Sequence, residues 1–140
     1  MTNTLFKDRF GNTMWGQNFD MMYYIWTEIP GFSKFGRYIG NGSASKGPMI
    51  NCGFRPKWFM LKRDTDSTNW FILDSAREPF NPLDDTLYAN SDAAESSQHD
   101  MHFLSNGVKI ASADGEVNYN DSHYFYAAFA ESPFKTARAR

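Results

Sequence analysis

The sequence has very little cysteine and lacks long hydrophobic runs. Its single cysteine, Cys52, excludes an intramolecular disulfide framework and a zinc site built from several cysteines. No apolar run approaches the ~20 residues of a membrane-spanning helix, and the N-terminus lacks the basic-then-apolar order of a secretory signal. We therefore expect a protein that is made in a reducing cytoplasm, does not insert into a membrane and folds by packing alone.

An excess of charge of one sign is also missing. The 140 residues include 14 Lys and Arg against 16 Asp and Glu, which gives a formal net charge of −2. Because a nucleic-acid-binding domain typically presents a strongly basic face, the sequence predicts no nucleic-acid partner. The length fits one domain and is too short for two ordinary hydrophobic cores.

Aromatic residues, by contrast, are abundant. The chain contains 13 Phe, 7 Tyr and 4 Trp, and aromatics make up 17% of all residues. Such side chains build cores and interfaces, so this composition excludes disorder as a description of the whole chain.

The apolar stretches are short, rich in β-branched and aromatic residues, and bounded by Gly, Pro, Asn or Asp, which is typical of strands. The clearest candidates cover residues 21–29, 57–63, 69–74 and 124–131, and weaker ones cover residues 36–39, 49–52, 86–89, 101–104 and 108–111. No window predicts a long helix, and residues 92–97 offer at most one helical turn. We predict an all-β fold, an antiparallel β-sandwich of jelly-roll type with about eight or nine short strands.

Turn chemistry supports this interpretation. Asn106-Gly107 lies between two apolar stretches and predicts a hairpin with a type I′ turn, which needs positive φ at both central residues. Residues 64–68 are polar and predict an exposed loop between two antiparallel strands. Both faces of those two strands are largely apolar, so we expect them to lie between layers or under a partner.

The chain also contains a short internal repeat. Residues 21–30 match residues 124–133, and the matched pairs are Tyr23 with Tyr126, Trp26 with Phe129, Glu28 with Glu131 and Pro30 with Pro133. We interpret this as one strand type present at both ends of a unit. The predicted organisation is an N-terminal arm, residues 1–20, and a single β-sandwich domain, residues 21–140, with the repeated strand at 21–30 and 124–133.

Six segments in order resemble a poorly characterised repeat domain of virion proteins from tailed phages, especially marine and cyanobacterial ones. They are GFSKFGRYIGNGS (31–43), GFRPKWFMLKR (53–63), NWFILDSAREPFNP (69–82), LYANSDAAE (87–95), HFLSNGVKI (102–110) and YFYAAFAESPFK (124–135). The domain often occurs as tandem copies in fibre-like proteins. The resemblance implies a place in the virion, after synthesis in the host cytoplasm, and it carries no catalytic residues to this chain.

Candidate chemical sites all have simpler interpretations. His99 and His102 have a metal-ligand spacing only if their segment is helical, and the surrounding strand and turn signals favour polar loop histidines. Cys52 is expected to pack as a small hydrophobe. Glu28 and Glu131 could in principle form the carboxylate pair of a glycosidase, but their equivalence by repetition favours a structural role.

We therefore predict no catalytic, cofactor-binding or metal-binding residues. The spacing of Asp64, Asp66 and Asn69 is similar to the start of a calcium loop, but the central glycine and the distal glutamate of that motif are absent. A hairpin loop is the favoured interpretation.

Surface residues are the remaining candidates. The arm holds six large apolar residues for which two interpretations stay open, folding back on the domain or docking on a neighbouring subunit: Leu5, Phe6, Phe10, Met14, Trp15 and Phe19. Two polar loops are candidates for receptor recognition, through Asp64, Asp66, Asn69, Asn81, Asp84 and Asp85.

The resulting functional prediction is a noncatalytic phage virion structural protein on the particle exterior. A tail-fibre or adhesin-type module for host attachment is expected first, and a capsid or tail decoration protein is the alternative. A glycan-processing enzyme is the competing class. The expected partners are further copies of this chain, other virion proteins and a host-surface glycan.

Overall fold

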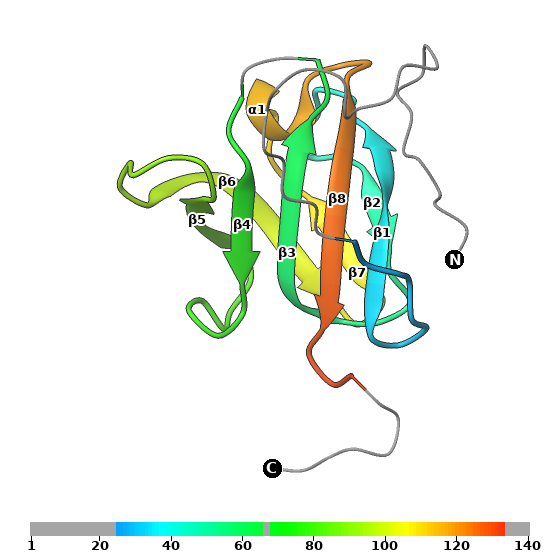
Figure 1. The fold of residues 1–140 in the computed structure, drawn as a ribbon. Coiled ribbons are helices and arrows are strands. Elements are labelled where there is room, and N and C mark those ends of the chain that lie inside the picture. Colours follow the sequence, from blue (N-terminus) through cyan, green and yellow to red (C-terminus); the bar gives the residue numbers. More distant parts are fainter. Residues whose placement is uncertain (1–24, 66–67, 134–140) are drawn as a thin grey trace, which may run out of the picture.

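The computed structural model describes residues 25–65 and 68–133 (Figure 1). This part of the chain contains eight strands and one short helix. In chain order they are β1 (Ser33–Ile39), β2 (Met49–Asn51), β3 (Pro56–Arg63), β4 (Phe71–Asp74), β5 (Leu83–Tyr88), β6 (Ser96–Leu104), β7 (Gly107–Ile110), α1 (Gly115–Asn118) and β8 (His123–Ala130).

The strands form one antiparallel sheet in the order β1-β8-β3-β4-β5-β6-β7-β2. Strand β5 makes the corner, because Leu87 and Tyr88 pair with β4, whereas Leu83 and the residues just after it pair with β6. A register shift between Leu83 and Asp85 accompanies this change of partner, and such irregularities bend a strand. The sheet is consequently nearly closed, like a barrel. The all-β antiparallel class is confirmed, and the finer jelly-roll sandwich is not.

The core follows from alternation along the strands. Phe59 and Leu61 of β3 are completely buried, while the residues between and beside them face outward. The ring of Phe59 packs against Tyr126 of β8, with centroids 5.7 Å apart, and against Phe103 of β6, 6.3 Å away. Because β3 and β6 are not neighbours in the sheet, the Phe59–Phe103 contact joins its two walls across the interior.

Helix α1 covers one end of the sheet (Figure 1, top). It begins after Asp114, whose side chain accepts a hydrogen bond from the backbone N–H of Glu116 at 2.7 Å, as an N-cap residue does. Two buried hydroxyls anchor the helix, because Tyr38 donates to the Val117 carbonyl at 2.6 Å and Tyr124 donates to the Gly115 carbonyl at 2.8 Å.

Asn118, at the end of α1, is fully buried and ties this helix to two loops. Its side-chain amide donates to the carbonyls of Ser112, at 2.8 Å, and Ser43, at 3.1 Å. Its side-chain oxygen accepts from the backbone N–H of Asn41 at 2.8 Å. The end of the sheet is therefore closed by a fixed polar network. The sequence predicted no helix here, so helix α1 was missed.

The expectation of a strand over residues 21–29 is wrong in its described part. Residues 25–28 form no regular structure, and Ile29 makes only an isolated bridge with Ser33. A turn at residues 30–32, with Gly31 at φ 75°, folds the chain back so that the Ser33 hydroxyl accepts a hydrogen bond from the Ile29 N–H at 3.1 Å. In the described part of the first copy, residues 25–30, the repeat thus does not form a strand. Residues 1–24, and with them the arm, lie outside the described residues.

The hairpin between β6 and β7 is confirmed, but the predicted turn type is wrong. Leu104 pairs with Gly107, so the two loop residues are Ser105 and Asn106, and neither Asn106 nor Gly107 has a positive φ. Gly107 has a different role, since a Cβ there would lie 1.9 Å from the carbonyl oxygen of Ile50. Glycine at this position allows β2 to approach β7.

Candidate functional site

An aromatic surface covers the outer side of β1, β8 and β3. Tyr124 and Ala128 of β8 are buried inside the sheet, so alternation places Phe129 on the outside. Phe129 is the centre of a set of rings that we call the outer aromatic patch, consisting of Trp26, Phe32, Phe35, Trp58 and Phe129.

The rings of the outer aromatic patch contact one another directly. The Phe129 centroid lies 5.9 Å from Phe32, 5.8 Å from Phe35 and 5.6 Å from Trp58. Phe35 also stacks on Trp26 at 6.4 Å, and Trp26 is 60% exposed. Phe35 contacts both Trp26 and Phe129, so these two residues, which are matched in the sequence repeat, lie on the same surface.

The apolar surface continues along the same strands. Ile39 at the end of β1 and Phe125 of β8 are both about half exposed, at 54% and 45%. The Arg37 guanidinium lies over the Phe125 ring, 5.0 Å from its centroid, in a cation–π contact. Contiguous exposed apolar surface of this kind marks interaction sites in soluble proteins.

The described residues of the first predicted recognition loop bond to other parts of the fold. The Asp64 carboxylate forms an ion pair with Arg37 at 3.0 Å, and its backbone N–H donates to the His123 carbonyl at 3.0 Å. The Asn69 side chain accepts a hydrogen bond from the amide of Asn90 at 3.1 Å. Asp66 lies outside the described residues.

Several polar groups of the second predicted loop also have partners within the fold. The Asn81 side chain accepts from the Phe103 N–H at 2.8 Å and donates to the Phe103 carbonyl at 3.1 Å, as a paired strand residue would. The N–H groups of Asp84 and Asp85 donate to one oxygen of Glu78, at 2.8 and 3.0 Å. Three carboxylates thus lie together here, but the Glu78 carboxylate is occupied by these backbone donors.

The two loops do not form one site. Residues 64–69 precede β4 and residues 81–85 follow it, so they lie at opposite ends of this strand (Figure 1). The six arm residues offered as assembly contacts, Leu5, Phe6, Phe10, Met14, Trp15 and Phe19, lie outside the described residues.

The two matched glutamates are held in separate ion pairs. Glu28 contacts Lys34 Nζ at 2.8 Å, and the hydrogen bond from Lys34 lowers the pKa of the Glu28 carboxyl. Glu131 contacts Arg55 Nε at 3.1 Å. Each carboxylate therefore has a cationic partner of its own.

The histidines differ from the loop prediction, which is wrong for both. His99 lies in β6, its side chain is only 1% exposed, and its ring packs edge-on against Phe71 with centroids 5.0 Å apart. His102 lies in the same strand three residues later, on the opposite face, so the two rings cannot share an ion. His99 alternates with Met101 and Phe103 along β6, and this alternation is the sequence pattern that indicates its burial. The polar residues just before His99 made the pattern hard to recognise.

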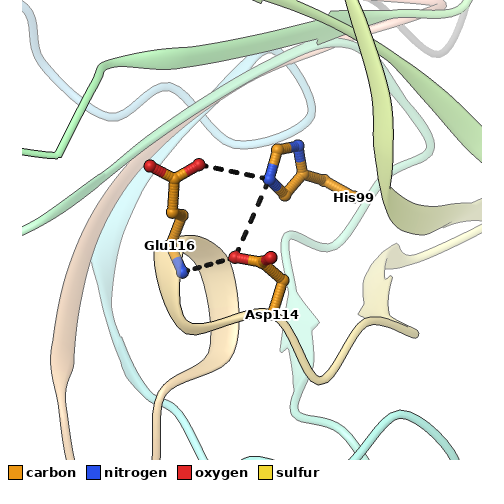
Figure 2. Close-up of side chains that lie close together, drawn as sticks. All are labelled: His99, Asp114 and Glu116. Carbon is orange, nitrogen blue, oxygen red and sulfur yellow. Dashed lines mark hydrogen bonds and ion pairs between the residues drawn. The ribbon is translucent and has the colours of Figure 1, made fainter.

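His99 points at two carboxylates near the start of α1 (Figure 2). Its Nε2 lies 3.5 Å from Glu116 Oε2 and 3.8 Å from Asp114 Oδ1. Within the described residues, neither ring nitrogen has a hydrogen-bond partner. A buried polar atom without a partner destabilises a fold by about 1–3 kcal/mol, so this ring is placed at an energetic cost. Imidazole and carboxylate together are groups that could hold a metal ion.

These features define an all-β protein with a nearly closed antiparallel sheet, an aromatic outer face and a histidine–carboxylate cluster at one end. Its family is shown by the match of residues 1–133 to the model of the Domain of unknown function (DUF7483), and the chain belongs to that family. No curated protein and no solved structure matches it. In the described part of the chain, no helix has the length and hydrophobicity needed to cross a membrane.

Proposed function

We propose that this chain is a noncatalytic structural protein of a bacteriophage virion, displayed on the particle exterior, that works by binding. The observation that carries the proposal is the outer aromatic patch, because exposed Trp26 and four partly exposed rings continue into the exposed Phe125 and Ile39 on one face of the sheet. The sequence resemblance to repeat domains of phage fibre-like proteins supplies the virion context.

A tail-fibre or adhesin-type module is the first candidate within the virion. Exposed rings such as Trp26 can stack on sugar rings of a host glycan as well as on protein side chains. A capsid or tail decoration protein is the second candidate. It is favoured by the recognition loops, since Asp64, Asn69 and Asn81 already use their polar groups within the fold.

The binding role is tested by removing exposed apolar groups from this face. We expect Trp26→Ser combined with Phe125→Ser to weaken self-association, measured by analytical ultracentrifugation, and incorporation into particles, measured by quantitative immunoblotting of purified virions. The matched control is Phe80→Ser, because Phe80 is 80% exposed and, among the described residues, takes no part in the ring contacts of the patch. Unchanged assembly of the double variant, or an equal loss in the control, would contradict the proposal.

Electron microscopy of particles with and without this protein separates the two candidates. Density restricted to the tail supports the fibre-type role, and stoichiometric density on the capsid lattice supports decoration. The noncatalytic part is tested separately with host polysaccharide as substrate. Turnover that is lost in Glu28→Gln or Glu131→Gln, with the fold intact, would show that the chain is an enzyme.

A further inference from the structure

We propose that His99, Asp114 and Glu116 form a binding site for one divalent transition-metal ion, for which Zn²⁺ is the best match. The inference goes beyond the binding role proposed above and does not depend on it. It rests on the cluster in Figure 2, which joins strand β6 to the start of α1 at the closed end of the sheet.

The spacing of the three donor atoms suits a small ion. Nε2 of His99 lies 3.5 and 3.8 Å from the two carboxylate oxygens, and one ligand atom from each residue lies within 4.8 Å of the others. Ligands bound at about 2.0–2.2 Å in a tetrahedral arrangement are themselves separated by about 3.4 Å. Small side-chain adjustments would therefore bring all three donors to bonding distance.

The imidazole is prepared as a ligand. A neutral histidine binds metal through a ring nitrogen that has no other partner, and among the described residues neither nitrogen of His99 accepts or donates a hydrogen bond. Burial against Phe71 fixes the plane of the ring, so its orientation does not have to be selected on binding. A metal bond would satisfy a buried atom that the fold otherwise leaves without a partner.

The carboxylates are fixed in place by α1. Asp114 is the N-cap residue, and the hydrogen bond to the Glu116 N–H keeps the two residues in one tight turn. The helix cannot easily move because Val117 and Asn118 are completely buried. The carboxylate side chains are 37% and 44% exposed, which gives an ion a path from solvent and leaves a position for a water ligand.

Charge and ligand type select the class of ion. Across residues 25–65 and 68–133, neither Asp114 nor Glu116 forms an ion pair with a lysine or arginine, so two neighbouring negative charges face the imidazole without a cationic side chain. A divalent cation would compensate them. Mg²⁺ and Ca²⁺ prefer sites made entirely of oxygen ligands, whereas Zn²⁺ readily combines imidazole with carboxylate.

The test uses the untagged full chain and the metal alone. We expect isothermal titration with ZnCl₂ to give one site per chain and saturating Zn²⁺ to raise the melting temperature, with no such rise from MgCl₂ or CaCl₂ at equal concentration. The test variants are Asp114→Asn, which keeps the N-cap, and Glu116→Gln. Each is expected to weaken Zn²⁺ binding at least tenfold, and together they should abolish it. The control His102→Gln should bind as the original chain does.

A second measurement identifies the histidine without a variant that risks unfolding. In long-range ¹H–¹⁵N spectra of the imidazoles, Zn²⁺ should shift the Nε2 resonance of His99 and leave those of His102 and His123 unchanged. The proposal is overturned if Zn²⁺ does not bind, if the double variant binds with unchanged affinity, or if His102→Gln removes binding.

Discussion

Replacing Asn118 with alanine should destabilise the fold through a small number of identifiable hydrogen bonds. The side chain makes three bonds of 3.1 Å or shorter, to the carbonyls of Ser112 and Ser43 and from the N–H of Asn41. At about 1 kcal/mol for each, their loss lowers the free energy of unfolding by about 3 kcal/mol. For a domain of this size, that corresponds to a fall of about 10 °C in the melting temperature.

Urea denaturation followed by tryptophan fluorescence, with thermal melts by circular dichroism, measures this change. The matched control is Asn120→Ala, because Asn120 is exposed and, within the described residues, its side-chain amide donates a hydrogen bond only to the neighbouring Asp121 carboxylate, at 2.8 Å. We expect the control to alter stability by less than about 0.5 kcal/mol. If Asn118→Ala behaved like Asn120→Ala, the network at the end of α1 would not stabilise the fold as described.

Three further predictions concern other parts of the sheet. Gly107→Ala should lower stability by about 1–3 kcal/mol in urea denaturation, because its Cβ would meet the Ile50 carbonyl oxygen at 1.9 Å; unchanged stability would mean that β2 moves freely. Burial alone would raise the pKa of Asp74, but hydrogen bonds from Arg77 and nearby backbone lower it. The ionised Asp74 carboxylate therefore stabilises the fold fully above about pH 4, and this contribution is lost as the pH falls through the lowered pKa. Asp74→Asn should therefore reduce stability by about 1 kcal/mol at pH 7 and by less below pH 4, and a constant difference across this range would contradict the assignment. Burial raises the pKa of Cys52 to about 11, so this thiol should react with Ellman's reagent only upon unfolding, and rapid reaction of the native protein would argue against its burial.

Several strands could be predicted because their sequences are short apolar stretches, rich in aromatic and β-branched residues, that end at turn residues. The stretches that became β3, β4 and β8 are apolar on both faces, so the sequence predicted the strands but not which face is buried. The burial of Cys52 was predicted as well, since a lone cysteine without basic neighbours packs as an apolar residue.

Other features depend on contacts between distant segments. The first half of β6 is polar, and its pairing with β5 appears only when the corner at Leu83 has formed. Helix α1 has four residues, too few for a helical period, and it exists because Tyr38 and Tyr124 bind its backbone.

The candidate metal site could not be predicted for the same reason. His99 is distant in sequence from Asp114 and Glu116, and only the tertiary fold brings their side chains together. The sequence instead drew attention to His99 with His102, which are close in the chain but lie on opposite faces of β6. Likewise, the match between residues 21–30 and 124–133 did not predict the turn at Gly31 or the lack of regular structure at residues 25–28.

The pairing of β1 with β8 has a consequence for how the protein is made. These two strands are the first and last of the described chain, and they are neighbours along their whole lengths, from Ser33 opposite Phe129 to Ile39 opposite His123. Bringing them together requires closure of a loop that includes every other strand, which slows folding relative to a helical domain of similar size. The sheet can therefore reach its final form only after β8 has left the ribosome, so β1 lacks its neighbouring strand until then.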